Sequence, residues 1–192
     1  MTNIPFLYLR HIASSGAYIV LSNQDIKKAI SGGKLRFSPA LSDEQIGSAS
    51  VDLTLDGKFW LFKKKYSSSK KPVDLSKVDF REATEELTAD SLTLPSGGMA
   101  LGITREKITM PDDLIGTLEG RSRFARMGLA VHVTSALVQP GSDNHQVLEI
   151  VNFAPFPVTI HKGMRISQII FEKLDSKTTK PYAKFGKIAR RQ

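Results

Sequence analysis

Three arginines and a serine are grouped within six residues of the chain, directly after Gly120. They are Arg121, Ser122, Arg123 and Arg126. Each guanidinium can place two hydrogen bonds on phosphate or carboxylate oxygens, and glycine lets the backbone approach a ligand closely. If residues 121–127 form a short helix, Ser122 and Arg126 share a face of it. The cluster therefore fits a site for a phosphate-bearing ligand, and a solvated basic turn that packs through Phe124 is an equally good interpretation.

A single acid, Glu149, lies within the apolar run 147–151, whose β-branched residues are typical of a strand. Side chains alternate along a strand, so Glu149 shares a face with Val147 and Val151, and the composition predicts that both faces are buried. An acid in such a place needs a partner or a function. Two interpretations stay open: a general base that later acts as general acid near neutral pH, or a structural ion pair with one of the arginines.

The stretch that holds both features resembles the dCTP deaminase family, which lies within the dUTPase-like superfamily. The family motif Gly-Arg-Ser-Ser-Leu-Ala-Arg is matched at 120–126, and His-Val-Thr, Pro-Gly and Val-Leu-Glu follow at 132–134, 140–141 and 147–149. Further similar segments lie at 46–53, 110–116 and 163–168, so that the resemblance covers about 21–174. Several independent motifs in the same order and at similar spacing make this resemblance specific.

The resemblance implies hydrolytic deamination of dCTP to dUTP and ammonia, a step of pyrimidine deoxynucleotide metabolism, without a metal at the reacting carbon. In this family reaction water adds at C4 of cytosine. The expected catalytic residues are Glu149, which takes and returns the proton, Ser122, which positions the water, and Arg126, which orients Glu149.

The resemblance also implies which residues contact the nucleotide. The expected substrate-binding residues are Arg121, Ser122, Arg123, Phe124, Ala125, Arg126, Gln139, Val147, Leu148, Glu149, Tyr182 and Lys184. Mg²⁺ is expected on the nucleotide phosphates, with no zinc and no metal held by the protein itself. The family is normally a homotrimer in which the arginine motif of one subunit faces the glutamate strand of another. The expected partners are therefore dCTP, with dUTP or dTTP as further nucleotides, and other copies of the chain.

The chain departs from the family pattern at several positions. Arg123 replaces the second serine of the motif, Gln139 replaces an aspartate that helps to hold the deoxyribose, and Ser142 replaces an aromatic residue. Tyr182 and Lys184 resemble nucleotide-contacting residues at a compressed spacing, and a basic terminus without a role is the other interpretation. Two alternatives therefore stay open: a dUTP pyrophosphatase or bifunctional dCTP deaminase–dUTPase, and a divergent non-catalytic paralogue that binds a nucleotide or a protein.

Composition limits the other classes of function. The 192 residues suffice for one domain, and no apolar run has transmembrane length. The absence of cysteine argues against the zinc-dependent cytidine deaminases, which hold their metal with cysteines. The N-terminal segment carries Arg10 and His11 in its middle and is a poor secretory signal, so a cytoplasmic location is expected. The net charge of +8 favours polyanions, but the lysine-rich runs lack interleaved aromatic residues, which leaves nucleic-acid binding as a minor alternative.

The elements that must position these residues are mostly short strands. Ser22 can cap a helix that ends near Ile30, with Asp25 completing a capping box. The expected strands are 50–55, 58–62, 91–94, 99–103, 106–109, 115–119, 130–134, 146–153, 157–160 and 166–173. Many short strands predict a β-sandwich, jelly roll or barrel, and the resemblance narrows this to the mainly-β, distorted barrel of the dUTPase-like type with a short N-terminal helix.

The domain organisation follows from the same patterns. The prediction is an unassigned N-terminal extension over 1–20, one domain over 21–174 and a basic, flexible tail over 175–192. The polar segment 67–89 is expected to be a loop with a helical piece.

Overall fold

The computed structural model describes residues 19–132 and 134–185. The extension predicted over 1–20 lies outside the described residues except for its last two positions, and so do the last seven residues of the predicted tail. No helix within the described ranges is long and apolar enough to cross a membrane.

The N-terminal helix α1 (Asn23–Ser31) begins at the predicted capping box. The backbone N–H of Asp25 donates to Ser22 Oγ at 3.3 Å, and the backbone N–H of Ser22 donates to Asp25 Oδ2 at 3.1 Å. These reciprocal bonds satisfy backbone groups that a helix start leaves without partners. Ile26, on the inner face of α1, is fully buried in the core.

The strands confirm that the chain is mainly β. They are β1 (Arg36–Ser38), β2 (Val51–Phe62), β3 (Thr84–Thr88), β4 (Ser91–Leu94), β5 (Met99–Thr109), β6 (Leu114–Gly120), β7 (Leu129–Val131), β8 (Leu137–Val138), β9 (Asp143–Asn152), β10 (Val158–His161) and β11 (Arg165–Lys173). Short helical turns separate some of them: η2 (Asp43–Gln45), α2 (Lys64–Ser67), α3 (Phe80–Ala83), α4 (Ser122–Ala125) and α5 (Tyr182–Phe185).

Two pairs of predicted strands are each one long strand with an irregular middle. The ladder between β2 and β5 shifts register between Leu55 and Phe59, and the ladder between β5 and β9 shifts between Ile103 and Lys107. The sequence breaks near residues 56–57 and 104–105 therefore mark irregularities within β2 and β5 and do not end either strand.

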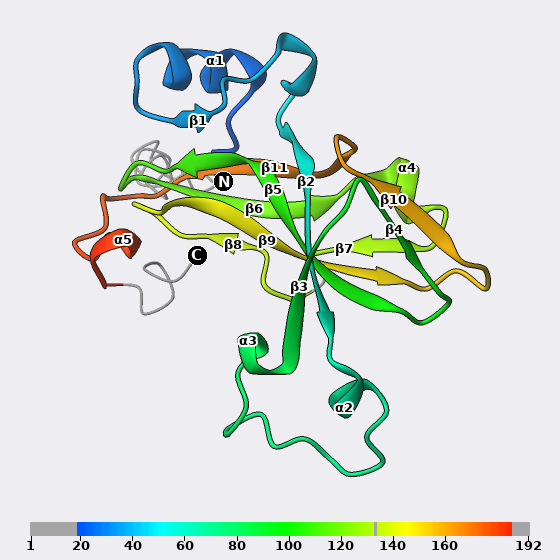
Figure 1. Ribbon diagram of the computed structural model, residues 1–192. Helices are drawn as coiled ribbons and strands as arrows, with labels where there is room; N and C mark the ends of the chain where they lie inside the picture. The colour runs from blue at the N-terminus through cyan, green and yellow to red at the C-terminus, as the bar shows by residue number, and fades with distance from the viewer. Residues whose placement is uncertain (1–18, 133, 186–192) are drawn as a thin grey trace, which may run out of the picture.

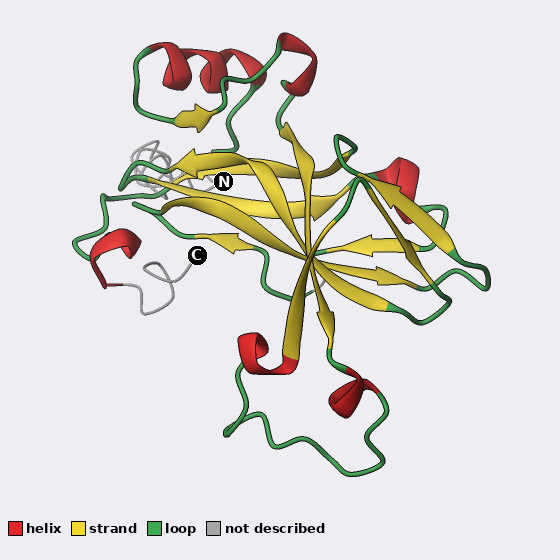
Figure 2. Ribbon diagram, viewed as in Figure 1, coloured by secondary structure: helices red, strands yellow, loops and turns green. Residues whose placement is uncertain are grey.

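A curled antiparallel sheet forms the body of the molecule (Figures 1 and 2). Seven strands follow the order β7-β9-β5-β2-β11-β6-β8, while β1 adds to β5 and β3 adds to β2. Strands β10 and β4 form a separate pair. This arrangement resembles half of a barrel, with β7 and β8 at the ends of the path, and it agrees with the predicted dUTPase-like class.

The predicted loop 67–89 is wrong in its last part. Thr84–Thr88 form β3, which pairs with Lys58–Phe62 of β2 although most of its side chains are exposed and polar. Pairing with an existing strand decided the structure where composition favoured a loop. The connection from β2 to β3, which carries α2 and α3, projects from the lower end of the sheet in Figure 1.

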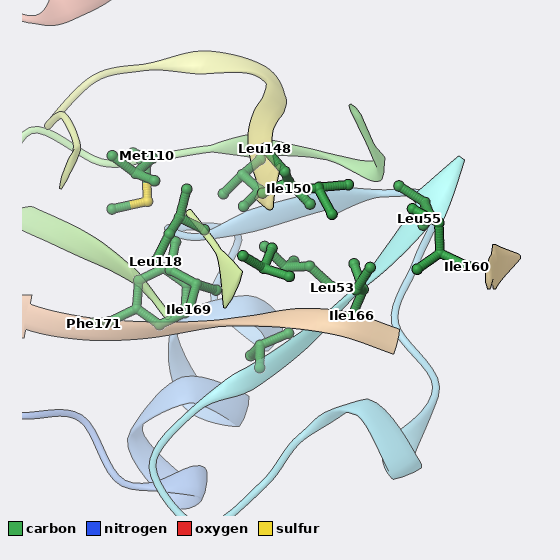
Figure 3. Packing of buried hydrophobic residues seen from close by; sticks show 14 of the residues in the cluster. Leu53, Leu55, Met110, Leu118, Leu148, Ile150, Ile160, Ile166, Ile169 and Phe171 are labelled. Carbon is green, nitrogen blue, oxygen red and sulfur yellow. The ribbon is translucent and has the colours of Figure 1, made fainter. Parts of the chain in front are cut away.

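The core lies inside the curl of the sheet (Figure 3). Leu53, Leu148, Ile150, Ile169 and Phe171 are fully buried there. Burying each such side chain contributes roughly 1.5–3 kcal/mol. Because Leu148 and Ile150 face this core, the opposite face of β9 is turned away from it.

Candidate active site

The face of β9 that carries Glu149 is not buried, which corrects the prediction for residues 147–151. Leu148 and Ile150 have no exposed surface, whereas Val147, Glu149 and Val151 are only partly buried. The apolar composition predicted that both faces of this strand are buried. In the structure the protein packs on only one of these faces. Glu149 therefore lies at a surface that a ligand can reach.

That surface is hollowed into a cleft of about 680 Å³, which is the size of a small-molecule site. One wall is apolar and comes from β2, α3 and β5, through Phe62, Phe80, Met99 and Leu101. The polar side chains come from the connection between β7 and β8, from the turn between β8 and β9, and from β9 itself. They include Thr134, Gln139, Ser142, Asn144, Gln146 and Glu149. An apolar wall opposite a few polar groups suits a flat heterocycle that must also be oriented.

Thr134 holds the carboxylate of Glu149 through two hydrogen bonds. Its backbone N–H donates to Glu149 Oε2 at 2.9 Å, and its hydroxyl donates to the same oxygen at 2.6 Å. The backbone N–H of His132 donates to the carbonyl oxygen of Glu149 at 2.7 Å. The described residues thus fix the acid at its main chain and at Oε2.

His132 adopts a left-handed backbone conformation, with φ of 62°. Few residues other than glycine take this conformation, although histidine does so more readily than most. Its ring Nε2 meets the backbone carbonyl of Ser135, and the ring lines the cleft beside Thr134. The bend at His132 brings the chain from the end of β7 across to the side chain of Glu149.

The turn before β9 and the first residues of β9 supply neutral polar groups to the cleft. Ser142 is 2% exposed, and its hydroxyl has no hydrogen-bond partner within the described part of the chain. Asn144 is also buried, and the side chain of Gln146 donates to the backbone carbonyl of Asn144 at 3.0 Å. Gln139, predicted to face the sugar, is exposed and also lines the cleft.

The end of β6 and helix α4 position the arginine motif. Helix α4 is the short helix that was predicted within residues 121–127. Arg121 does not point at Glu149: it forms an ion pair with Asp52 Oδ2 at 2.9 Å and donates to the backbone carbonyl of Arg165 at 2.9 Å. Burial raises the pKa of Asp52, while Arg121 and Arg165 act in the opposite direction. Arg121 therefore holds the motif on the sheet.

The rest of the motif faces solvent. Ser122, Arg123, Ala125 and Arg126 are exposed, and Phe124 packs against the core. No ion pair joins Glu149 to an arginine among the described residues, and neither arginine nor lysine lines the cleft there. One chain does not bring together the predicted catalytic residues Ser122, Arg126 and Glu149.

The chain after β11 returns to the cleft. The backbone N–H of Tyr182 donates to the carbonyl of Pro140 at 2.9 Å, and that of Ala183 donates to the carbonyl of Gly141 at 3.1 Å. Tyr182 lines the cleft, whereas Lys184 is exposed and does not. Helix α5 lies at the opposite end of the sheet from α4 (Figure 1).

Several cleft residues were not singled out from the sequence. Thr134 was part of a matched motif but was assigned no role, and Phe62 and Phe80 gave no signal because they lie far from the other site residues in the chain. In contrast, the predicted contact residue Leu148 has a fully buried side chain, so only its backbone can meet a ligand.

Comparisons with known proteins show the family to which the chain belongs. A family described as dCTP deaminase-like matches residues 20–174. The chain is 38% identical over 173 residues to a dCTP deaminase of Marinomonas sp. (strain MWYL1), covering 85% of this chain and 88% of that protein. It is 34% identical over 164 residues to a dUMP-forming dCTP deaminase of Methanosphaera stadtmanae, covering 85% and 83%.

A solved structure shows the same fold. The structure of the 2'-deoxycytidine 5'-triphosphate deaminase from Agrobacterium tumefaciens aligns with a TM-score of 0.63 at 21% sequence identity. The alignment covers 82% of this chain and 48% of that one, so this chain spans about half its length.

Proposed function

Because the chain belongs to the dCTP deaminase-like family, we propose that it deaminates dCTP to dUTP and ammonia. The observation that carries this proposal is the position of Glu149. It is a carboxylate on the open face of a strand, held by Thr134 in a cleft with an apolar wall. A pyrimidine that lies against that wall presents its edge to the carboxylate of Glu149.

The chemistry needs one group that takes a proton and returns it. Glu149 removes a proton from water as the water oxygen bonds to C4 of cytosine, and it delivers that proton to the ring nitrogen N3. Glu149 then takes the remaining proton from the new C4 hydroxyl and passes it to the exocyclic amine, the C4–N bond breaks, and ammonia leaves as the C4 carbonyl forms. Thr134 keeps the carboxylate oriented through these steps.

The triphosphate requires cations that the described cleft of one chain does not supply. The exposed arginines of α4 are suited to phosphate oxygens, but they lie outside the cleft. A closed, symmetric oligomer brings α4 of one copy to the cleft of the next. We therefore propose a homotrimer in which Ser122 and Arg126 of one subunit complete the site of another, where Arg126 faces Glu149 and Ser122 positions the water.

The other assigned contacts fit the same complex. Arg123 adds charge near the phosphates, Arg121 holds the motif in place, and Gln139 and Tyr182 meet the sugar end of the nucleotide. Mg²⁺ enters with the triphosphate as part of the substrate and neutralises phosphate charge.

The first experiment incubates the purified protein with dCTP and MgCl₂ and separates the nucleotides. We expect dUTP and ammonia in equal amounts. Glu149→Gln, which keeps the size of the side chain, should lower kcat by about two to four orders of magnitude and still bind dCTP. A parent protein that leaves dCTP unchanged, or a Glu149→Gln variant with parental kcat, would remove the proposal.

The same assay separates the second candidate, a bifunctional enzyme. It is favoured by the similarity to a relative described as dUMP-forming. Release of dUMP and pyrophosphate from dCTP would assign that activity, whereas accumulation of dUTP assigns deamination alone.

The shared site is tested by mixing two inactive variants. In Glu149→Gln the arginine motif is intact, and in Arg126→Ala the glutamate is intact. If the site lies between subunits, random mixed oligomers should regain about a quarter of the parental activity, because half of the copies carry each intact element. Unmixed variants are the controls, and a mixture as inactive as both of them would place the site within one chain.

A further inference from the structure

Strand β5 contains a bulge where it pairs with β9, the strand that carries Glu149. Ile103 pairs with Val147 and Lys107 pairs with His145, so three residues of β5 lie opposite one residue of β9. Such insertions bend a strand and re-aim its side chains. The bulge residues Thr104 and Glu106 are both buried.

Thr104 makes three hydrogen bonds at the bulge, one within β5 and two to β9. Its hydroxyl donates to the backbone carbonyl of Glu106 at 2.8 Å and accepts from the backbone N–H of Gln146 at 2.9 Å. Its own carbonyl oxygen lies 2.9 Å from His145 Nδ1. The side chain of Thr104 has no exposed surface, so it cannot meet a ligand itself.

Glu106 fixes the other side of the bulge. Its carboxylate accepts from the backbone N–H of Thr54 at 2.8 Å and from Gln45 Nε2 at 2.8 Å. It is 2% exposed, and these two partners are neutral. An acid is costly to bury with neutral donors, so its presence at this bulge points to a geometric requirement there.

The bulge lies opposite the point in β9 at which the alternation of cleft-lining residues is interrupted. Ser142, Asn144 and Gln146 line the cleft before this point, and Val147 and Glu149 line it afterwards. In a regular strand Gln146 and Val147 would face opposite sides. Both face the cleft here, next to the backbone N–H that Thr104 holds.

We propose that Thr104 is a positioning residue for Glu149, with Glu106 holding the bulge that Thr104 closes. The hydroxyl of Thr104 holds the backbone of β9 at Gln146, where the side-chain alternation is interrupted. It thereby orients the carboxylate of Glu149, three residues after Gln146. This inference rests on the proposed deaminase function for its kinetic consequence, but the structural consequence is independent of it.

The test compares Thr104→Val with Thr104→Ser. Valine keeps the volume and loses the hydroxyl, whereas serine keeps the hydroxyl and loses a buried methyl group. We expect Thr104→Val to lower kcat by about tenfold through misplacement of the reacting group with a smaller change in KM, and Thr104→Ser to keep the parental kcat. A role in packing alone predicts the reverse order.

Hydrogen exchange of residues 143–149, measured without nucleotide, gives a second readout. We expect faster exchange in Thr104→Val and parental exchange in Thr104→Ser. Glu106→Gln offers one acceptor oxygen to two donors and should shift exchange and kcat in the direction of Thr104→Val. All rates are taken at a temperature where thermal unfolding shows each variant to be folded.

The outcomes separate this inference from the proposed function. Parental exchange and kcat in Thr104→Val, or equal losses of kcat in the valine and serine variants, would overturn the positioning role. A parent protein without deaminase activity would overturn the proposed function, and the exchange comparison would still judge the role of Thr104 in β9.

Discussion

Thr134 gives both of its hydrogen-bond donors to one carboxylate oxygen of Glu149, at 2.9 Å from the backbone N–H and 2.6 Å from the hydroxyl. Hydrogen bonds to an ionised acceptor are stronger than those between neutral groups. This pair of hydrogen bonds joins a matched sequence motif in the connection between β7 and β8 to the proposed catalytic acid on β9.

Removal of the Thr134 hydroxyl should therefore impair the reaction more than the fold. We expect Thr134→Val to lower kcat by about tenfold, because a hydrogen bond to a charged group contributes about 1.5–3 kcal/mol. Thr134→Ser, which keeps the hydroxyl, should stay near the parental rate. Steady-state kinetics with dCTP measures both, and equal rates for the valine and parent proteins would show that this bond does not orient the acid.

Gly141 should control how the C-terminal segment docks on the cleft. Its φ is +71°, and an added Cβ would lie 2.6 Å from Pro181 Cβ and 2.8 Å from Asp112 Oδ1. We expect Gly141→Ala to displace Pro181 and Tyr182, which trypsin would report as faster cleavage at Lys184.

Gly163 provides the matched control for that variant. Its φ is +85°, but an added Cβ would have no heavy atom within 4 Å. Gly163→Ala should share the left-handed backbone penalty of about 1–2 kcal/mol without faster cleavage at Lys184. Similar cleavage rates in the two alanine variants would mean that contact with Pro181 does not hold the segment.

Asp52 and Asp143 should titrate on opposite sides of the usual aspartate value of 3.8. Burial raises the pKa of Asp52 against the opposing effect of Arg121, whereas the hydrogen bond from Thr109 lowers the pKa of Asp143. Carboxyl ¹³C NMR titration measures both midpoints. Midpoints on the same side of 3.8 would contradict the electrostatic description of one of the two sites.

The raised pKa of Asp52 also fixes the sign of its effect on stability. In the pH range just above 3.8 the folded state keeps a proton that the unfolded state has released. The contribution of Asp52 is therefore complete below 3.8 and is lost as pH rises through its folded pKa. As pH rises through the folded pKa of Asp52, the free energy of unfolding of the parent should fall relative to that of Asp52→Asn. Urea denaturation of both proteins at a series of pH values measures this difference.

Ser142 should differ from other buried serines when its hydroxyl is removed. The hydroxyl has no partner within the described ranges, whereas Ser167 Oγ, which is also buried, donates to the carbonyl of Glu119 at 2.8 Å. We expect Ser142→Ala to leave the free energy of unfolding unchanged or raise it, and Ser167→Ala to lower it by about 1 kcal/mol. Urea denaturation compares them, and equal losses would show that Ser142 is bonded in solution.

The sequence predicted the parts of the molecule that depend on neighbours along the chain. The capping box of α1, the short helix at the arginine motif and most strands follow from local patterns of side chains. The motif spacing indicated the fold class and singled out Glu149 as the candidate acid. The prediction failed for Thr84–Thr88, because β2 supplies the pairing partner that makes this polar segment a strand.

The tertiary structure decided which of these groups meet. Sequence spacing does not say that Arg121 binds Asp52, that Thr134 holds Glu149, or that the cleft face of β9 is open, because each depends on strands that pair over long separations. The pairing of the strands in the curled sheet sets those relationships. The residue types that can do the chemistry were thus determined by the sequence alone, and their orientation was determined by backbone pairing that no local pattern encodes.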